Sequence, residues 1–176
     1  MIIIVEGIDR VGKSTLVDRI HHDINFPVYS HVSIGSRNFD AIKNVEETDK
    51  FLQVMEICNL SHANIIFDRF YMSDFVYGCI QRHYDFTEAL KNKDEIEMRL
   101  KKLDALLILV SPTNIKESSL QHGCDLLRHK RLFDFLYKET KLLKMEVTYN
   151  SLYEAEKWVK KQFNFFMNGG GYDYVR

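Results

Sequence analysis

The stretch IIIVEGIDRVGKST, residues 2–15, decides the fold of this 176-residue chain. Residues 2–5 are four consecutive β-branched residues with no polar alternation, which is typical of a strand buried on both faces of a parallel sheet. The run stops at Gly7, and an apolar pattern with helical spacing predicts a helix from Lys13 to about His22. A strand, a glycine-containing turn and a helix form the opening of a βαβ unit.

Further strands and helices alternate along the rest of the chain. Apolar runs predict strands at residues 64–67, 105–110 and 145–149, and the alternating pattern of residues 28–33 is consistent with a further strand. The segments between them predict helices at residues 45–62, 72–83, 88–102, 125–144 and 152–166. Strands separated by helix-sized segments indicate a doubly wound α/β domain. We therefore expect one domain over residues 1–176, with a five-stranded parallel sheet in the order 2-3-1-4-5 and helices on both faces.

The turn after the first strand fits the phosphate-loop pattern G-x-x-x-x-G-K-[ST]. Gly7 and Gly12 allow positive φ angles, so that the backbone can wrap phosphate oxygens with its N–H groups. Lys13 supplies a charge to the β- and γ-phosphates, and the Ser14 hydroxyl is a ligand for Mg²⁺. The sequence therefore predicts a P-loop NTPase-type fold that binds ATP with Mg²⁺ through Gly7, Ile8, Asp9, Arg10, Val11, Gly12, Lys13, Ser14 and Thr15.

A second polar signal lies at the end of the predicted strand in IIFDRF, residues 65–70. Ligands of doubly wound sheets bind beyond the carboxyl ends of the strands, so Asp68 and Arg69 should point towards the phosphates. A carboxylate in this position can hold the Mg²⁺ shell, and a guanidinium can hold a second phosphate through two hydrogen bonds.

Two motifs carry a resemblance to a known family. VEGIDRVGKSTL at residues 5–16 and FDRFYMSDFVYG at residues 67–78 resemble the thymidylate kinase branch of the nucleoside monophosphate kinases. The later segments LDALLILVSP (103–112) and LRHKRLFDFLYKE (127–139) are similar to the fourth strand of that family and to the helix after its mobile lid. The resemblance implies transfer of the γ-phosphoryl group of ATP to a (deoxy)nucleoside monophosphate in nucleotide biosynthesis. It also implies a homodimer, and the short chain suggests a small viral member.

The resemblance implies a role for each matching residue. Asp9 would lie near the acceptor sugar and the Mg²⁺ shell, while Phe70 and Tyr77 would wall the acceptor site. Arg69 would hold the acceptor phosphate. Arg10 lies inside the loop, where it could bridge donor and acceptor phosphates in the manner of an arginine finger. The predicted catalytic residues are Arg10, Lys13, Asp68 and Arg69, of which Asp68 joins Ser14 at the metal.

The sequence also departs from the family pattern. Gly78 stands where the family usually has a glutamine, and the arginine-bearing helix before the third strand has no match, so the acceptor base stays open. We expect the base pocket to draw on Arg37, Phe39 and Gln53. A cationic lid over residues 113–131 should supply Lys116 and Arg128 to the donor. The glycine-rich tail, residues 168–176, is expected to be mobile.

Composition excludes several other classes. There are 24 Lys and Arg residues against 25 Asp and Glu, so no basic excess favours a nucleic-acid partner. Eighteen consecutive apolar residues occur nowhere, which predicts no membrane span.

Three scattered cysteines predict reduced thiols and a cytoplasmic location, in the host cytoplasm if the chain is viral. Seven histidines lack the spacing of a metal site.

Two alternatives stay open, and a third is set aside. A deoxynucleoside kinase would need a carboxylate to accept the proton of the 5′-hydroxyl, and Glu6 or Asp68 could serve. A nucleotide-binding module without catalysis would keep only the loop. Asn92-Lys93-Asp94-Glu95 is similar to the guanine-reading motif of small GTPases, but its Asp comes one position early and the segment is predicted to be helical.

Overall fold

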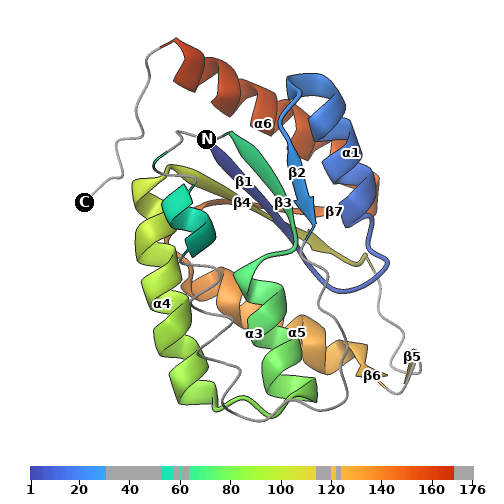
Figure 1. Cartoon of the computed structure of the whole chain (residues 1–176). Coiled ribbons are helices and arrows are strands. Elements are labelled where there is room, and N and C mark those ends of the chain that lie inside the picture. Colours follow the sequence, from blue (N-terminus) through green and yellow to red (C-terminus); the bar gives the residue numbers. More distant parts are fainter. Residues whose placement is uncertain (31–52, 58–59, 61–63, 114–119, 122–123, 169–176) are drawn as a thin grey trace.

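The structure, a computed structural model, describes residues 1–30, 53–57, 60, 64–113, 120–121 and 124–168. Its centre is a five-stranded sheet in which all paired neighbours are parallel. The strand order is β2-β3-β1-β4-β7, which confirms the predicted order 2-3-1-4-5 (Figure 1). The strands are β1 (Ile2–Glu6), β2 (Val28–Ser30), β3 (Ile65–Asp68), β4 (Ala105–Ser111) and β7 (Leu143–Thr148).

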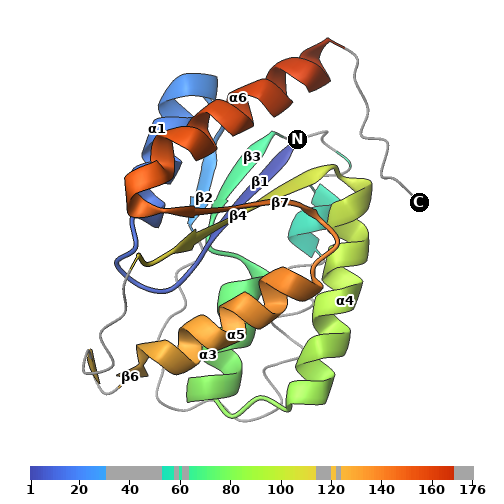
Figure 2. The same cartoon turned by 180° about the vertical axis from the view of Figure 1, so that it is seen from behind.

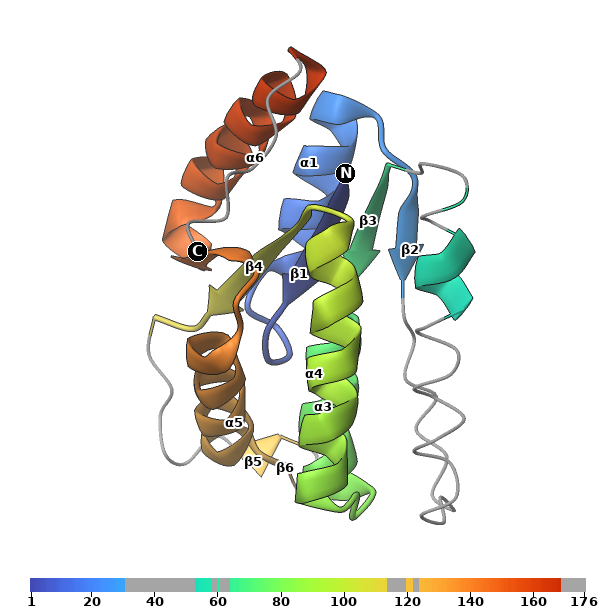
Figure 3. The same cartoon turned by 90° about the vertical axis from the view of Figure 1, so that its left-hand side faces the viewer.

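Helices cover both faces of this sheet. One face carries α1 (Lys13–Ile24) and α6 (Leu152–Met167), which pack against each other (Figure 2). The other face carries α3 (Tyr71–Gln81), α4 (Phe86–Lys102) and α5 (Leu126–Glu139). A side view shows α3 and α4 together on the side away from α6 (Figure 3). No helix in the described ranges is long and apolar enough to cross a membrane.

The middle of the sheet is the core of the molecule. Every residue of β1 and of β4 is buried, as the unbroken apolar runs in both segments predict. Because the strands are parallel, their carboxyl ends meet at one edge, where the phosphate loop follows β1 and Asp68 ends β3. The Asn92–Glu95 segment lies inside α4, which agrees with its exclusion as a GTPase motif.

The boundary between α5 and β7 differs from the predicted one. The sequence predicts a helix over 125–144, but α5 ends at Glu139 and β7 begins at Leu143, where it pairs with β4. The side chain of Lys144 turns back and donates to the carbonyl oxygens of Tyr137 and Thr140, at 2.6 and 3.0 Å. Lys144 thus satisfies carbonyl groups at the helix end, a role that helical spacing alone cannot reveal.

Several predictions fall partly outside the described residues. Of the predicted helix 45–62, residues 53–57 and 60 are described and helical. Of the lid, a two-residue pair of antiparallel strands is described, β5 (Leu120–Gln121) with β6 (Cys124–Asp125), while residues 114–119 and 122–123 lie outside. In the tail, residues 169–176 also lie outside. The homodimer that the resemblance implies stays a prediction.

Replacing Lys144 should destabilise the protein through the end of α5. We expect Lys144→Met to lower the free energy of unfolding by about 1–2 kcal/mol, since the variant leaves carbonyl groups of the helix end without their charged donor. For a domain of this size the melting temperature should fall by roughly 2–8 °C. Thermal unfolding followed by circular dichroism measures this, with the exposed Lys141→Met as the matched control. Equal melting temperatures for both variants would contradict the capping role.

Candidate active site

The loop after β1 has the backbone geometry of a phosphate-binding loop. Gly7 and Gly12 have φ angles of 139° and 97°. A Cβ on Gly7 would lie 2.2 Å from the carbonyl oxygen of Val110 in β4, and one on Gly12 would lie 2.5 Å from the ring of Tyr149. Only glycine fits at either position, as predicted. Arg10 also has a positive φ, 62°, and its side chain is exposed.

Lys13 begins α1 with a buried side chain that is 5% exposed. Its ammonium group donates to the carbonyl oxygen of Ile8 at 2.5 Å, inside the loop. Burial, with the nearby charge of Arg69, lowers the pKa of Lys13 to about 8. A dehydrated cation at a helix N-terminus is well placed to bind phosphate oxygens. The side chains of Ile8 and Val11 lie in the core, so these residues offer the ligand only their backbone.

The two predicted metal ligands, Ser14 and Asp68, are hydrogen-bonded to each other. The Ser14 hydroxyl donates to Asp68 Oδ2 at 3.1 Å, which joins the start of α1 to the end of β3. Both groups offer oxygen atoms, and Mg²⁺ is usually held by one or two protein oxygens together with substrate phosphates. Ser14 and Asp68 therefore fit Mg²⁺. Across the described ranges no cluster of three or more His, Cys, Asp or Glu side chains could form a separate metal site.

Arg69 reaches back across the phosphate loop. Its guanidinium donates to the Gly7 carbonyl oxygen at 3.4 Å and forms an ion pair with Asp9. Its backbone has a φ of 69°, in the left-handed region, and its amide donates to the carbonyl oxygen of Val5 at 3.0 Å. The second cation predicted from the sequence thus lies at the same sheet edge as the loop, and β1 holds it there.

Glu6, the last residue of β1, is fully buried against the start of α3, with 0% exposure. One carboxylate oxygen accepts hydrogen bonds from the amides of Phe70, Met72 and Ser73, at 2.8, 3.1 and 3.2 Å. The other accepts from the Ser73 hydroxyl at 2.5 Å. Burial raises the pKa of Glu6, although these hydrogen bonds oppose the shift. The sequence analysis named Glu6 as a possible base for a nucleoside hydroxyl. In the structure both oxygens of this carboxylate accept hydrogen bonds from the protein's own amides and from the Ser73 hydroxyl.

Of the two predicted acceptor walls, the structure places one beside the site. Tyr77 is half-buried, and the guanidinium of Arg69 lies 5.6 Å from its ring centre. Burial raises the pKa of Tyr77 to about 12. Phe70 is 0% exposed, with its ring 4.3 Å from that of Phe67. The prediction that Phe70 walls the acceptor site is therefore wrong, because an aromatic residue at this strand end fills the core instead.

The remaining predicted ligand-binding residues are either exposed or outside the described residues. Gln53 is exposed at the start of the described helical segment 53–57, and Arg128 is exposed on α5. Thr15 is exposed on the first turn of α1. Arg37, Phe39 and Lys116 lie outside the described residues. Their roles at the acceptor base and the donor stay predictions.

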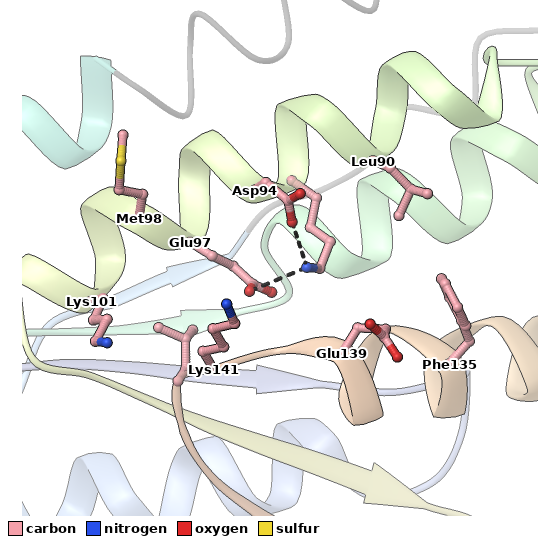
Figure 4. A pocket seen from close by; sticks show the side chains of 10 residues that line it. Leu90, Asp94, Glu97, Met98, Lys101, Phe135, Glu139 and Lys141 are labelled. Atoms are coloured by element: carbon pink, nitrogen blue, oxygen red, sulfur yellow. Dashed lines mark hydrogen bonds and ion pairs between the residues drawn. The ribbon is translucent and has the colours of Figure 1, made fainter. Parts of the chain in front are cut away.

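A separate hollow of about 560 Å³ lies between α4 and α5 (Figure 4). The buried Lys93, which lines it, pairs with Asp94 and Glu97, at 3.0 and 3.2 Å. Glu97 also accepts a hydrogen bond from the Tyr71 hydroxyl at 2.7 Å. No predicted site residue lines the hollow, whose walls are Leu90, Lys93, Asp94, Glu97, Met98, Lys101, Phe135, Glu139, Lys141 and Leu142.

Two contacts at the site were not predicted from the sequence. Ser73 links the carboxylate of Glu6 to the guanidinium of Arg69, which donates to the Ser73 hydroxyl at 3.4 Å. Tyr149, 60% exposed in the short helix η1 (Tyr149–Ser151), packs its ring over Gly12. Ser73 belongs to the motif after β3, so its position in that motif could have indicated a role at the site. Nothing in the sequence around Tyr149 indicated its contact with Gly12, because that contact depends on how β7 pairs with β4.

The fold was compared with known proteins. Neither the known family models nor the curated proteins give a sequence match to this chain. Among solved structures, the YorR protein of Bacillus subtilis, in complex with phosphorylated GDP, is similar over 96% of this chain and 98% of its own, with a TM-score of 0.71 and 19% identity. The chain has a fold like that of the P-loop nucleotide kinases. A thymidylate kinase from Ehrlichia chaffeensis is similar over 90% of this chain and 98% of its own, with a TM-score of 0.61 and 14% identity.

Nucleotide binding to this kinase-like fold should weaken as the pH rises through 8. Burial lowers the pKa of Lys13 to about 8, so the ligand-free protein loses this charge above that pH. A polyphosphate favours the charged form, so binding should take up a proton there. We expect the Kd for ATP·Mg²⁺ to be constant between about pH 7 and 7.5 and to rise up to tenfold per unit above pH 8. Calorimetry measures both the affinity and the proton uptake.

Lys13→Met is the control for this titration. It should bind ATP·Mg²⁺ more weakly and without the rise in Kd above pH 8, because it has no proton to lose. The same pH dependence in both proteins would show that another group is responsible.

Proposed function

We propose that this chain is a phosphotransferase that moves the γ-phosphoryl group of ATP to a (deoxy)nucleoside monophosphate and forms the diphosphate. The observation that supports this most strongly is that two cationic side chains lie at one sheet edge. Lys13 lies in the phosphate loop, and Arg69 comes from β3 to the carbonyl oxygen of Gly7 in the same loop. One cation suits the donor phosphates and the other suits an acceptor phosphate.

Phosphoryl transfer needs positioning and charge neutralisation more than it needs a strong base. We assign the donor β- and γ-phosphates to Lys13 and the loop amides, and the acceptor phosphate to Arg69. Arg10, exposed in the same loop as Lys13, would bind the oxygens of the phosphoryl group during its transfer. Asp9 pairs with Arg69 and keeps its guanidinium directed at the loop.

Ser14 and Asp68 would hold Mg²⁺. When bound, the ion would neutralise charge on the donor phosphates. The Ser14 hydroxyl donates to Asp68, so the two side chains lie side by side.

The state of the carboxylates favours a monophosphate over a nucleoside acceptor. A nucleoside kinase requires a free carboxylate near the 5′-hydroxyl. Glu6 accepts four hydrogen bonds from the start of α3, and Asp68 accepts from Ser14. Arg69, by contrast, is a cation suited to an acceptor that carries its own phosphate. The likeness to a thymidylate kinase and to YorR with its phosphorylated GDP agrees with a nucleotide acceptor.

A screen of acceptors tests this proposal directly. ADP release is followed with ATP·Mg²⁺ and each common nucleoside or nucleoside monophosphate, and Lys13→Ala serves as the inactive control. We expect turnover of at least one monophosphate and of no nucleoside. Turnover of thymidine or deoxyadenosine, with none of any monophosphate, would establish a nucleoside kinase instead. Binding of ATP without any turnover would support a non-catalytic module.

Replacing Arg10 and replacing Arg69 should have different effects on kcat and KM. Arginine fingers contribute roughly 10³–10⁵ in rate, so Arg10→Ala should lower kcat by about 10²–10⁴ while the KM for ATP changes only a few-fold. Arg69→Ala should raise the KM for the acceptor as well, because the acceptor phosphate is charged before the reaction. Steady-state kinetics with both substrates separate these effects.

Arg19→Ala is the matched control for these variants, since Arg19 is an exposed arginine on α1 outside the loop. It should behave as the wild type in both substrates. If Arg10→Ala keeps more than about a third of the wild-type kcat, then Arg10 is not the group that stabilises the transition state.

A further inference from the structure

We infer that Glu6 is a positioning residue, which sets the Arg69 guanidinium for the acceptor phosphate without touching the substrate. This inference rests on the proposed function. Its basis is that both carboxylate oxygens of Glu6, at the end of β1, accept hydrogen bonds from the start of α3. This turn of the helix directly follows Arg69. A residue of the phosphate-loop strand thereby fixes the second phosphate site.

The start of α3 has no cap of its own. Phe70 occupies the N-cap position, and its side chain makes no capping hydrogen bond. The first amides of a helix have no partner inside the helix, and burying them without one is costly. Glu6 Oε1 accepts from three amides of this segment, and Oε2 accepts from the Ser73 hydroxyl. Glu6 is therefore the N-terminal cap of α3, supplied by a strand 64 residues earlier in the chain.

The same contacts constrain Arg69. Its own amide donates to the carbonyl oxygen of Val5, and the next amide along, that of Phe70, donates to Glu6. The peptide units on both sides of its Cα are thus bound to consecutive residues of β1. A φ of 69° is unfavourable for a residue with a side chain, so it persists only where the surroundings enforce it. Glu6 accepts one of the two hydrogen bonds that hold this backbone.

The guanidinium direction depends on this backbone. From its left-handed position Arg69 reaches the carbonyl oxygen of Gly7 and the carboxylate of Asp9. If the first turn of α3 shifts, the guanidinium leaves the loop. A carboxylate oxygen that faced an acceptor phosphate would repel it, whereas both oxygens of Glu6 accept hydrogen bonds from the segment between Phe70 and Ser73.

Two substitutions separate positioning from base catalysis. Glu6→Gln keeps the oxygen that accepts from the three amides, and its amide nitrogen can donate to Ser73, but it cannot accept a proton as a base. Glu6→Asp keeps a base but is one methylene shorter, so it cannot reach all three amides. We expect Glu6→Gln to lower the acceptor kcat/KM by no more than about threefold. Glu6→Asp should raise the acceptor KM by at least about tenfold.

Two further measurements test the physical path. Amide hydrogen exchange should show protection of Phe70, Met72 and Ser73 in Glu6→Gln and its loss in Glu6→Asp. In an Arg69→Ala background, Glu6→Asp should raise the acceptor KM no further, because the group that it positions is gone. The matched control is Glu97→Asp, since Glu97 is a buried glutamate that accepts a hydrogen bond from the Tyr71 side chain of the same turn. It should leave the acceptor KM within about twofold of the wild type.

The outcomes distinguish this inference from the proposed function. A wild type that phosphorylates only nucleosides overturns the proposed function, while the order of the Gln and Asp variants still decides the role of Glu6. If Glu6→Gln loses more activity than Glu6→Asp on whichever acceptor is used, Glu6 acts as a base and the inference is wrong. Unchanged amide protection in Glu6→Asp also overturns it, and thermal unfolding shows whether each variant is folded.

Discussion

The parallel pairing of β1 with β3 is the constraint on which the site depends. Its register places Val5 opposite Asp68, so the two strands end together. Beyond that point the chain of β1 turns into the phosphate loop, and the chain of β3 turns through Arg69 into α3. Ser14 then meets Asp68, and Arg69 meets the loop, because the two carboxyl ends lie side by side. A shift of one residue would reverse the side chains of β3 and break both contacts.

The charges at this edge are held by the protein before any phosphate arrives. The ammonium group of Lys13 donates to a loop carbonyl, and the guanidinium of Arg69 pairs with Asp9. Both cations thus have internal partners at the sheet edge, and under the proposed function the phosphates would replace these partners. Such preorganisation reduces the entropy that is lost when the ligand binds. It also explains why a lysine can remain buried here despite the cost of dehydrating its charge.

The sequence predicted the parts of this molecule whose chemistry is local. Buried runs predicted β1 and β4, and the loop pattern predicted the glycine conformations. The loop and the motif at the end of β3 together predicted that Ser14 and Asp68 lie close to each other. It failed where a distant partner decides. The helix expected through residue 144 gives way to β7, since pairing with β4 outweighs helical spacing. Phe70 fits an aromatic site wall by its position in the motif, but packing against Phe67 puts it in the core.

Gly78 shows how a departure from a family pattern can have a structural cause. The thymidylate kinase family, which this sequence resembles, usually has a glutamine at this position. From the sequence alone, its replacement by glycine indicates that a contact to the acceptor base has been lost. In the structure, a Cβ at this position would lie 2.2 Å from the ring of Tyr84, which is buried against α3.

The chain after α3 folds back to seat that ring. The amides of Arg82 and Tyr84 both donate to the Gly78 carbonyl oxygen, at 3.0 and 3.1 Å, and the Arg82 guanidinium covers the outer side of the ring at 4.8 Å. A longer side chain at residue 78 would have to displace this arrangement. The glycine is therefore required by packing, and any reading of the acceptor base must come from other residues than the one the family uses at this place.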